Sequence, residues 1–216
     1  MKMANKERIL LSSAYLGPVE YFSSFLTGRN VSIEQFDHYT KQTYRNRCVI
    51  LSANGPLPLV IPVVKNHGRK TYMKDTRIDY ATNWQRLHLH GITSAYNSSA
   101  FFEFYFDSFE RFFRKKTSFL LDLNIALTRI VLEELDLPVD VSLTSGYDSE
   151  TEAVTDMRDR IHPKKSLDTS AVFKPVPYTQ VFSERFGFVP NLSIIDLLFN
   201  AGPEAKSILK AGLKRF

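Results

Sequence analysis

Three basic side chains lie close together where the chain approaches an apolar segment. Lys41, Arg45 and Arg47 fall within seven residues of the stretch FDHYTKQTYRNRCVI, residues 36–50. If this stretch is extended, the two-residue period of a strand places all three on one face. Crowded cations repel one another unless an anion lies opposite, and a planar guanidinium offers paired donors that match a phosphate or a carboxylate. The pattern is therefore compatible with an anion-binding face, to which three neighbours could contribute: Tyr39, Tyr44 and Asn46.

The same cations have a second interpretation. They could pair with carboxylates of the chain itself, and Glu34, Asp37 and Asp75 are candidates. They could also lie on a solvated sheet face, where ion pairs contribute little to stability. The residues alone leave the anion site and the internal salt-bridge array both open.

His88 is the leading candidate for a general base. It shares one helical face with Trp84, and a histidine on such a face is more often a hydrogen-bonded core residue than a base. No pair of histidines has the spacing of metal ligands, so we expect no metal site. The motifs GxGxxG, GxxxxGK[ST], GxSxG and HExxH are all missing from the sequence, which indicates no particular cofactor.

The composition limits the class of protein. The chain has 216 residues, 44% of them apolar, which is enough for a sizeable core, and we expect a single domain over residues 1–216. No apolar run is long enough to span a membrane, and the run at residues 9–11 is too short for a signal peptide, so we predict a cytoplasmic protein. The net charge of +5 is too small to indicate nucleic acid as a partner. The single cysteine, Cys48, excludes an internal disulfide.

The first half of the chain predicts strands joined by turns. Residues 8–36 are typical of a strand, a helix and a second strand, which favours a parallel crossover. Two apolar runs over residues 48–64 flank Asn54-Gly55, the strongest short signal for a hairpin. A basic loop over residues 65–77 follows, with its bend at His67-Gly68. We therefore expect an α/β fold in which a small mixed sheet, with a strand-helix-strand opening and a hairpin, packs against several helices.

The second half predicts mainly helices. Apolar periodicity indicates helices within residues 84–136. Residues 139–169 are polar and charged, which indicates a surface excursion. A C-terminal helix capped by Asn191 or Ser193 should end at Gly202 and dock on the core. Within it, Asp196 either anchors a buried hydrogen-bond network or pairs with Arg45 or Arg47. The predicted core residues are Trp84, Leu87, Ile92, Phe102, Phe109, Phe113, Leu121 and Ile130.

Several segments, in order along the chain, resemble the WbqC-like protein family. They are YLGPVEYF at 15–22, Y-x-K-x-x-Y-x-N-R at 39–47, VIPVV at 60–64, the Asn-Trp segment at 83–102 and PNLSIIDLLFNAGPEA at 190–205. Many members of that family carry His-Gln-Pro near the start, where this chain has Ser12, Ser13 and Ala14. If that histidine is catalytic in the family, this chain has diverged from it.

The resemblance implies a role in bacterial surface-polysaccharide or lipopolysaccharide biosynthesis. It implies an enzyme, such as a transferase that moves an acyl or aminoacyl group, acting on an anionic small molecule such as a nucleotide-activated sugar. The alternative is a non-catalytic module that binds a glycan precursor or a protein partner. We expect His88 to act as the base, the loop 65–77 to cover the site, and these residues to bind substrate: Tyr15, Tyr39, Lys41, Tyr44, Arg45, Asn46 and Arg47.

Overall fold

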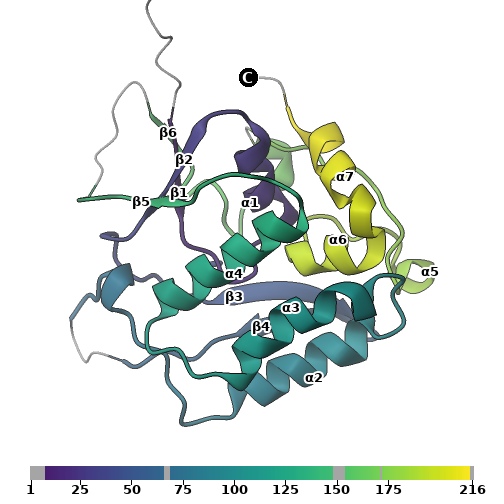
Figure 1. The fold of residues 1–216 in the computed structure, drawn as a ribbon, viewed down its shortest axis with the longest axis horizontal. Coiled ribbons are helices and arrows are strands. Elements are labelled where there is room, and N and C mark those ends of the chain that lie inside the picture. Colours follow the sequence, from purple (N-terminus) through teal and green to yellow (C-terminus); the bar gives the residue numbers. More distant parts are fainter. Residues whose placement is uncertain (1–7, 66–68, 148–153, 171, 215–216) are drawn as a thin grey trace, which may run out of the picture.

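The computed structural model describes residues 8–65, 69–147, 154–170 and 172–214 (Figure 1). It contains a four-stranded sheet, a two-stranded sheet and a set of helices, which confirms the predicted α/β class. Across the described residues, no helix combines the length and apolar character that a membrane crossing needs.

The four-stranded sheet is entirely parallel. Its order is β5-β2-β1-β6, with bounds Ser142–Leu143, Asn30–Glu34, Arg8–Ser12 and Val154–Asp156. The buried residues of β1 and β2 are nearly continuous, as expected of strands covered on both faces. Helix α1, Val19–Ser23, and a 3-10 turn at Ser24–Leu26 connect β1 to β2, which confirms the strand-helix-strand opening.

The predicted hairpin is also present. Strand β3, Arg47–Ser52, pairs antiparallel with β4, Gly55–Val60. Gly55 has a φ of 104°, a conformation that favours glycine and explains the Asn-Gly signal at this turn. Pro56 and Pro58 lack an N–H to donate, which suits a strand such as β4 that has one unpaired edge in a two-stranded sheet.

The prediction of a strand through residues 39–46 is wrong. The chain forms consecutive turns there, Gln42 has a φ of 60°, and β3 begins only at Arg47. Local hydrogen bonds stabilise the turns, since Thr43 Oγ1 donates to the carbonyl of Thr40 over 2.8 Å and accepts from the Arg45 N–H over 3.3 Å. The two-residue period therefore does not place Lys41, Arg45 and Arg47 on one strand face.

The helices follow the predicted order. The three central ones are α2, Trp84–Tyr96, α3, Phe102–Arg114, and α4, Leu120–Glu134. Short elements at Met73–Asp75, Leu167–Thr169 and Gly202–Glu204 are 3-10 turns. Three helices occupy the C-terminal region: α5, Ser183–Phe186, α6, Ile194–Ala201, and α7, Ala205–Gly212.

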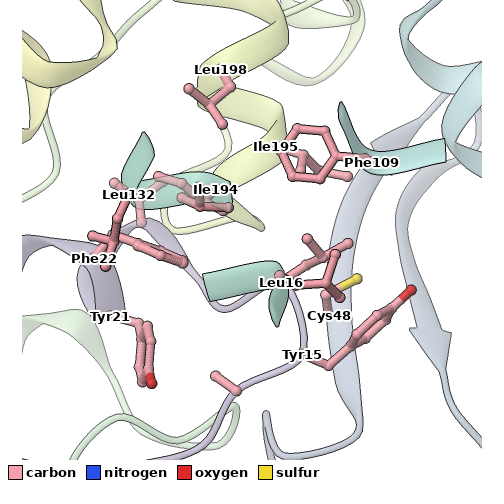
Figure 2. Close-up of a cluster of buried hydrophobic side chains, with 14 of the residues drawn as sticks. Tyr15, Leu16, Tyr21, Phe22, Cys48, Phe109, Leu132, Ile194, Ile195 and Leu198 are labelled. Atoms are coloured by element: carbon pink, nitrogen blue, oxygen red, sulfur yellow. The ribbon is translucent and has the colours of Figure 1, made fainter. Parts of the chain in front are cut away.

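One hydrophobic cluster joins these elements. Figure 2 shows side chains from α1, β3, α3, α4 and α6 near one another, among them Phe22, Cys48, Phe109, Leu132 and Ile195. Two core predictions are wrong: Leu87 is 66% exposed and Ile130 only partly buried. Trp84, His88, Ile92 and Ala95 form the buried face of α2, and Leu87 is displaced from that face by about 100° on the helix.

Residues 139–169 are not merely a surface excursion. They contain β5 and β6, which lie on opposite sides of the β2–β1 pair. These strands have two and three residues, too few for a hydrophobic period to identify them.

Helix α6 docks on the core as predicted, and Gly202 ends it with a φ of 54°. Ser193 occupies the N-cap position, but its hydroxyl donates to the Leu16 carbonyl over 2.7 Å instead of capping the helix. Asp196 accepts hydrogen bonds from Tyr96 Oη at 2.9 Å, Tyr178 Oη at 2.7 Å and Gln180 Nε2 at 2.9 Å. The buried-network interpretation of Asp196 is therefore confirmed.

Candidate functional site

Polar residues gather at one edge of the parallel sheet. Ser12 ends β1, Glu34 ends β2 and Asp156 ends β6, and Ser12 pairs directly with Glu34. Because all three strands run parallel, their carboxyl ends meet at the same edge. In open parallel sheets, this edge is where ligands usually bind.

An open pocket of about 510 Å³ lies at this edge. A narrower recess beside it is lined by Ser12, Ser13 and Ala14, the residues that follow the core of β1. Arg45 and Arg158 line both cavities. The open pocket is lined by Asp37, His38, Thr40, Arg45, Tyr147, Asp156, Arg158 and Asp159.

Arg45 forms an ion pair with Asp37 in the pocket wall. Its Nη2 donates to Asp37 Oδ2 and, over 2.7 Å, to Ser12 Oγ. The Ser12 hydroxyl lies 3.3 Å from the same Asp37 oxygen. Arg45 is 5% exposed and Asp37 is 9% exposed, so this is a largely desolvated pair that removal of either partner would leave uncompensated.

A second guanidinium, that of Arg158, is held by two carboxylates. Its Nε lies 3.1 and 3.0 Å from the two Asp156 oxygens, and Nη1 lies 3.4 Å from Glu34 Oε2. Partial burial raises the pKa of Asp156, but the hydrogen bonds and charge of Arg158 outweigh it and leave that pKa below its ordinary value. The hydrogen bond to Asp156 raises the pKa of Arg158 in turn. This pair therefore stays ionised at neutral pH.

Asn124 fixes the backbone around Arg45. It lies within α4, where it is fully buried, and its Nδ2 donates to the Arg45 carbonyl over 2.7 Å and to Ser13 Oγ over 3.2 Å. One helical side chain thus joins the end of β1 to the turn that carries Arg45.

The structure brings some of the other predicted binding residues near Arg45. Burial raises the pKa of Tyr39, while the charges of Arg47 and Arg45 and a hydrogen bond with Asn46 oppose that rise. Asn46 donates to the Ile61 carbonyl over 2.7 Å. Lys41 is exposed. Of this group, Arg45 is the residue that lines the pocket.

Arg47 differs from Arg45 in its partners. It begins β3 and is partly buried, and its buried Nε donates to none of the described residues. Burial raises the pKa of Tyr44 to about 12, with the Glu20 carboxylate adding to the rise and the Arg47 charge opposing it. Tyr44 also lines the recess beside Ser13, so the Arg47 charge lies near that recess. Arg47 forms no ion pair with a described carboxylate.

Tyr15 and His88 lie in the core. The Tyr15 hydroxyl is 2.9 Å from His88 Nδ1, and the two residues are 0% and 4% exposed. Burial lowers the pKa of His88 to about 4, with a hydrogen bond to the Val60 backbone opposing the change. His88 is therefore neutral at pH 7, as a base must be, but it does not line the pocket at the sheet edge.

Backbone hydrogen bonds join the basic loop to the segment that carries Asp37. Tyr39 N–H donates to the Thr71 carbonyl over 2.9 Å, and Met73 N–H donates to the Asp37 carbonyl over 2.8 Å. Residues 71–73 therefore support the segment that carries Asp37. The bend predicted at His67-Gly68 lies outside the described residues.

The sequence reasoning missed Asn124, Asp156 and Arg158, and it considered Asp37 only as a partner for the cations. Asn124 did have a signal in the sequence, because it is a polar residue inside the apolar pattern of α4. For metal ligands, the described ranges hold no group of three or more histidine, cysteine, aspartate or glutamate side chains arranged to bind an ion.

Comparison with known proteins bears on the same residues. A model of the WbqC-like protein family matches residues 13–172 and 167–208 of the chain. The match includes Asp37, Arg45, Asp156 and Arg158, and it begins one residue after Ser12. Neither the curated proteins nor the solved structures give a significant match.

Proposed function

The chain belongs to the WbqC-like protein family, and from that premise we propose that it binds a surface-polysaccharide precursor in the pocket at the sheet edge. The proposed precursor is a nucleotide-activated sugar of lipopolysaccharide or related polysaccharide assembly. The proposed reaction is the transfer of an acyl or aminoacyl group to that sugar. A cytoplasmic location, where such precursors are made, is part of the proposal.

One observation carries the proposal. Two nearly buried guanidinium groups, those of Arg45 and Arg158, converge on an open pocket at the carboxyl ends of β1, β2 and β6. Arginine matches phosphate oxygens through paired donors, and this edge of a parallel sheet is the usual site for nucleotide ligands. The pocket volume is within the range of small-molecule sites.

Both arginines retain donors for a diphosphate. Arg45 binds Asp37 and Ser12 through Nη2, and no described residue accepts a hydrogen bond from its Nη1. Arg158 uses Nη1 for one contact of 3.4 Å to Glu34. Arg47, near Tyr39 and Tyr44, adds a cation beside the recess. The substrate's phosphates therefore need not displace every carboxylate that holds these groups.

The other predicted residues enter the proposal with different roles. Tyr147 is 65% exposed at the pocket and lies 5.1 Å from the Arg158 guanidinium, so its ring offers an apolar surface for a sugar or a base. Tyr39, Tyr44, Asn46 and Lys41 would form the rim toward Arg47. Proton transfer by His88 would require the core between Tyr15 and Trp84 to open, and its burial disfavours that role.

A non-catalytic binding module is the second candidate. The observation that favours it is the segment Ser12-Ser13-Ala14, which lines the recess where many family members carry His-Gln-Pro. Such a module would use the same pocket, so binding comes first in either case. A turnover assay with a nucleotide sugar and an acyl or aminoacyl donor separates the two, because only the enzyme forms product.

Calorimetric titration with a panel of nucleotide sugars tests the binding itself. The informative variant is Arg158→Lys, which keeps the charge but loses the paired contact. We expect at least one sugar nucleotide to bind, and the variant to bind it about tenfold more weakly, since a charge-assisted bond contributes roughly 1.5 to 3 kcal/mol. Arg114→Lys is the matched control, because Arg114 pairs with Glu110 on the exposed face of α3. Equal affinity in all three proteins would contradict the proposal.

A further inference from the structure

The pocket at the sheet edge carries more carboxylates than free cations. Its lining includes three aspartates, Asp37, Asp156 and Asp159, and two arginines. Arg45 is engaged by Asp37, and Arg158 is engaged by Asp156 and Glu34. Arg160 is close enough to affect Asp156 but does not line the pocket. The lining therefore has one more carboxylate than guanidinium groups.

Within Asp37, one of the two carboxylate oxygens has no donor among the described residues. Its Oδ2 accepts from Arg45 and from Ser12, whereas Oδ1 is buried and makes no hydrogen bond with the described residues. A buried carboxylate oxygen without a donor is unfavourable, so Oδ1 of Asp37 can still accept a hydrogen bond. The Asp37 carbonyl is fixed by the Met73 N–H, which holds the carboxylate in the pocket wall.

Asp159 adds a second acceptor at the same pocket. It is exposed and follows directly after Arg158, whose donors are directed at Asp156 and Glu34. Asp37 in the wall and Asp159 near the solvent together suit a ligand group that brings several donors and a positive charge. An ammonium group has three donors and no acceptor.

We propose that this pocket takes an amino sugar, with the ammonium group bound by Asp37 and Asp159. This inference rests on the function proposed above and specifies its substrate: the sugar unit carries a free amine, while the phosphates contact the arginines. A neutral hydroxyl in place of the amine would supply fewer donors and no charge. An acetylated amine would lose the charge and place a methyl group against the carboxylates.

Three ligands that differ only at one carbon of the sugar test the inference: UDP-glucosamine, UDP-N-acetylglucosamine and UDP-glucose. We expect the wild-type protein to bind UDP-glucosamine about tenfold more tightly than the other two below the pKa of the amine, as a charge-assisted hydrogen bond implies. In Asp37→Asn this preference should disappear, because the amide carries no charge to match the ammonium group, and the ratio of the three affinities within each variant is the measure. Asp140→Asn, an exposed residue outside the pocket, should keep the preference.

The outcomes separate this inference from the function on which it rests. Equal binding of all three ligands by the wild-type protein would overturn the amine assignment and leave nucleotide-sugar binding in place. Binding of none of them would overturn the amine assignment, and the proposed function as well if the calorimetric panel also gives no ligand. If Asp37→Asn fails to fold, Asp159→Asn replaces it, and an unchanged preference in that variant would overturn the assignment.

Discussion

Two buried carboxylates in this protein, Asp196 and Asp37, have opposite surroundings. Asp196 is fully buried in α6 and accepts from three neutral donors, those of Tyr96, Tyr178 and Gln180. Asp37 lies in the wall of an open pocket, binds the Arg45 guanidinium and has one oxygen without a hydrogen bond from the described residues. The first site is complete without a ligand and stabilises the fold, whereas the second is open to one.

This difference shows how a charge buried for structure differs from a charge arranged for function. Neutral donors satisfy Asp196 without requiring a counter-ion, and its network joins α2 to the segment before α6. In the pocket, by contrast, opposite charges lie close together at the edge of a sheet, where strand ends leave room for solvent and ligand.

Deleting residues 190–216 should abolish folding. The deletion removes α6 and α7 together with Asp196, and it exposes the core residues against which Ile194, Ile195 and Leu198 pack (Figure 2). We propose that residues 1–216 form a single domain, so the pocket should be lost together with the core. Circular dichroism and soluble yield measure this, and a truncated protein with an unchanged melting curve would contradict it.

Asp196→Ala should lower the free energy of unfolding by about 3 kcal/mol, because it leaves three buried donors without their acceptor and each such group costs about 1 to 3 kcal/mol. Urea denaturation measures the change. Nucleotide-sugar affinity of the folded variant should stay at the wild-type level, since Asp196 does not line the pocket. Asp140→Ala, at an exposed position, is the control and should lie within about 0.5 kcal/mol of wild type. A loss of affinity in Asp196→Ala would mean that the two regions are coupled.

The two regions should respond oppositely to pH. Burial raises the pKa of Asp196, and the three hydrogen bonds only partly oppose this, so its contribution to stability is present below the unfolded pKa of about 4 and is lost as pH rises. The pKa of Asp156 is lowered on balance, so its contribution is present above that value and is lost as pH falls.

Denaturation at a series of pH values measures this difference. Relative to wild type, Asp196→Asn should be least stable at acidic pH and should recover as pH rises. Asp156→Asn should show the reverse, with its deficit greatest at neutral pH. Parallel pH profiles for the two variants would contradict the assignment of one carboxylate to a neutral network and the other to an ion pair.

Local signals in the sequence predicted much of the fold but only part of the site. Asn54-Gly55 defined the hairpin, the apolar period from Trp84 defined α2, and Gly202 marked the end of α6, because each depends on neighbours along the chain. Leu87 was misplaced because an apolar side chain beside a buried face fits the same periodic pattern.

The missing part of the site depends on contacts between distant segments. Strand β6 is only Val154–Asp156, and it exists because it pairs with β1, more than 140 residues earlier. Arg158 reaches the pocket through that pairing, and no local pattern marks it. The turns at 40–46 likewise depend on side-chain hydrogen bonds of Thr43 and on Asn124 from α4, while the cations themselves suggested a strand.

A crystal structure of the protein with a bound nucleotide sugar would show whether the pocket at the carboxyl ends of β1, β2 and β6 is the ligand site. We expect density for the diphosphate within hydrogen-bond distance of the Arg45 or Arg158 guanidinium, with the sugar toward Asp37 and Tyr147. Density for the ligand at another surface, such as the groove beside Tyr80 and Lys116, with Arg45 and Arg158 still held only by Asp37, Asp156 and Glu34, would contradict it.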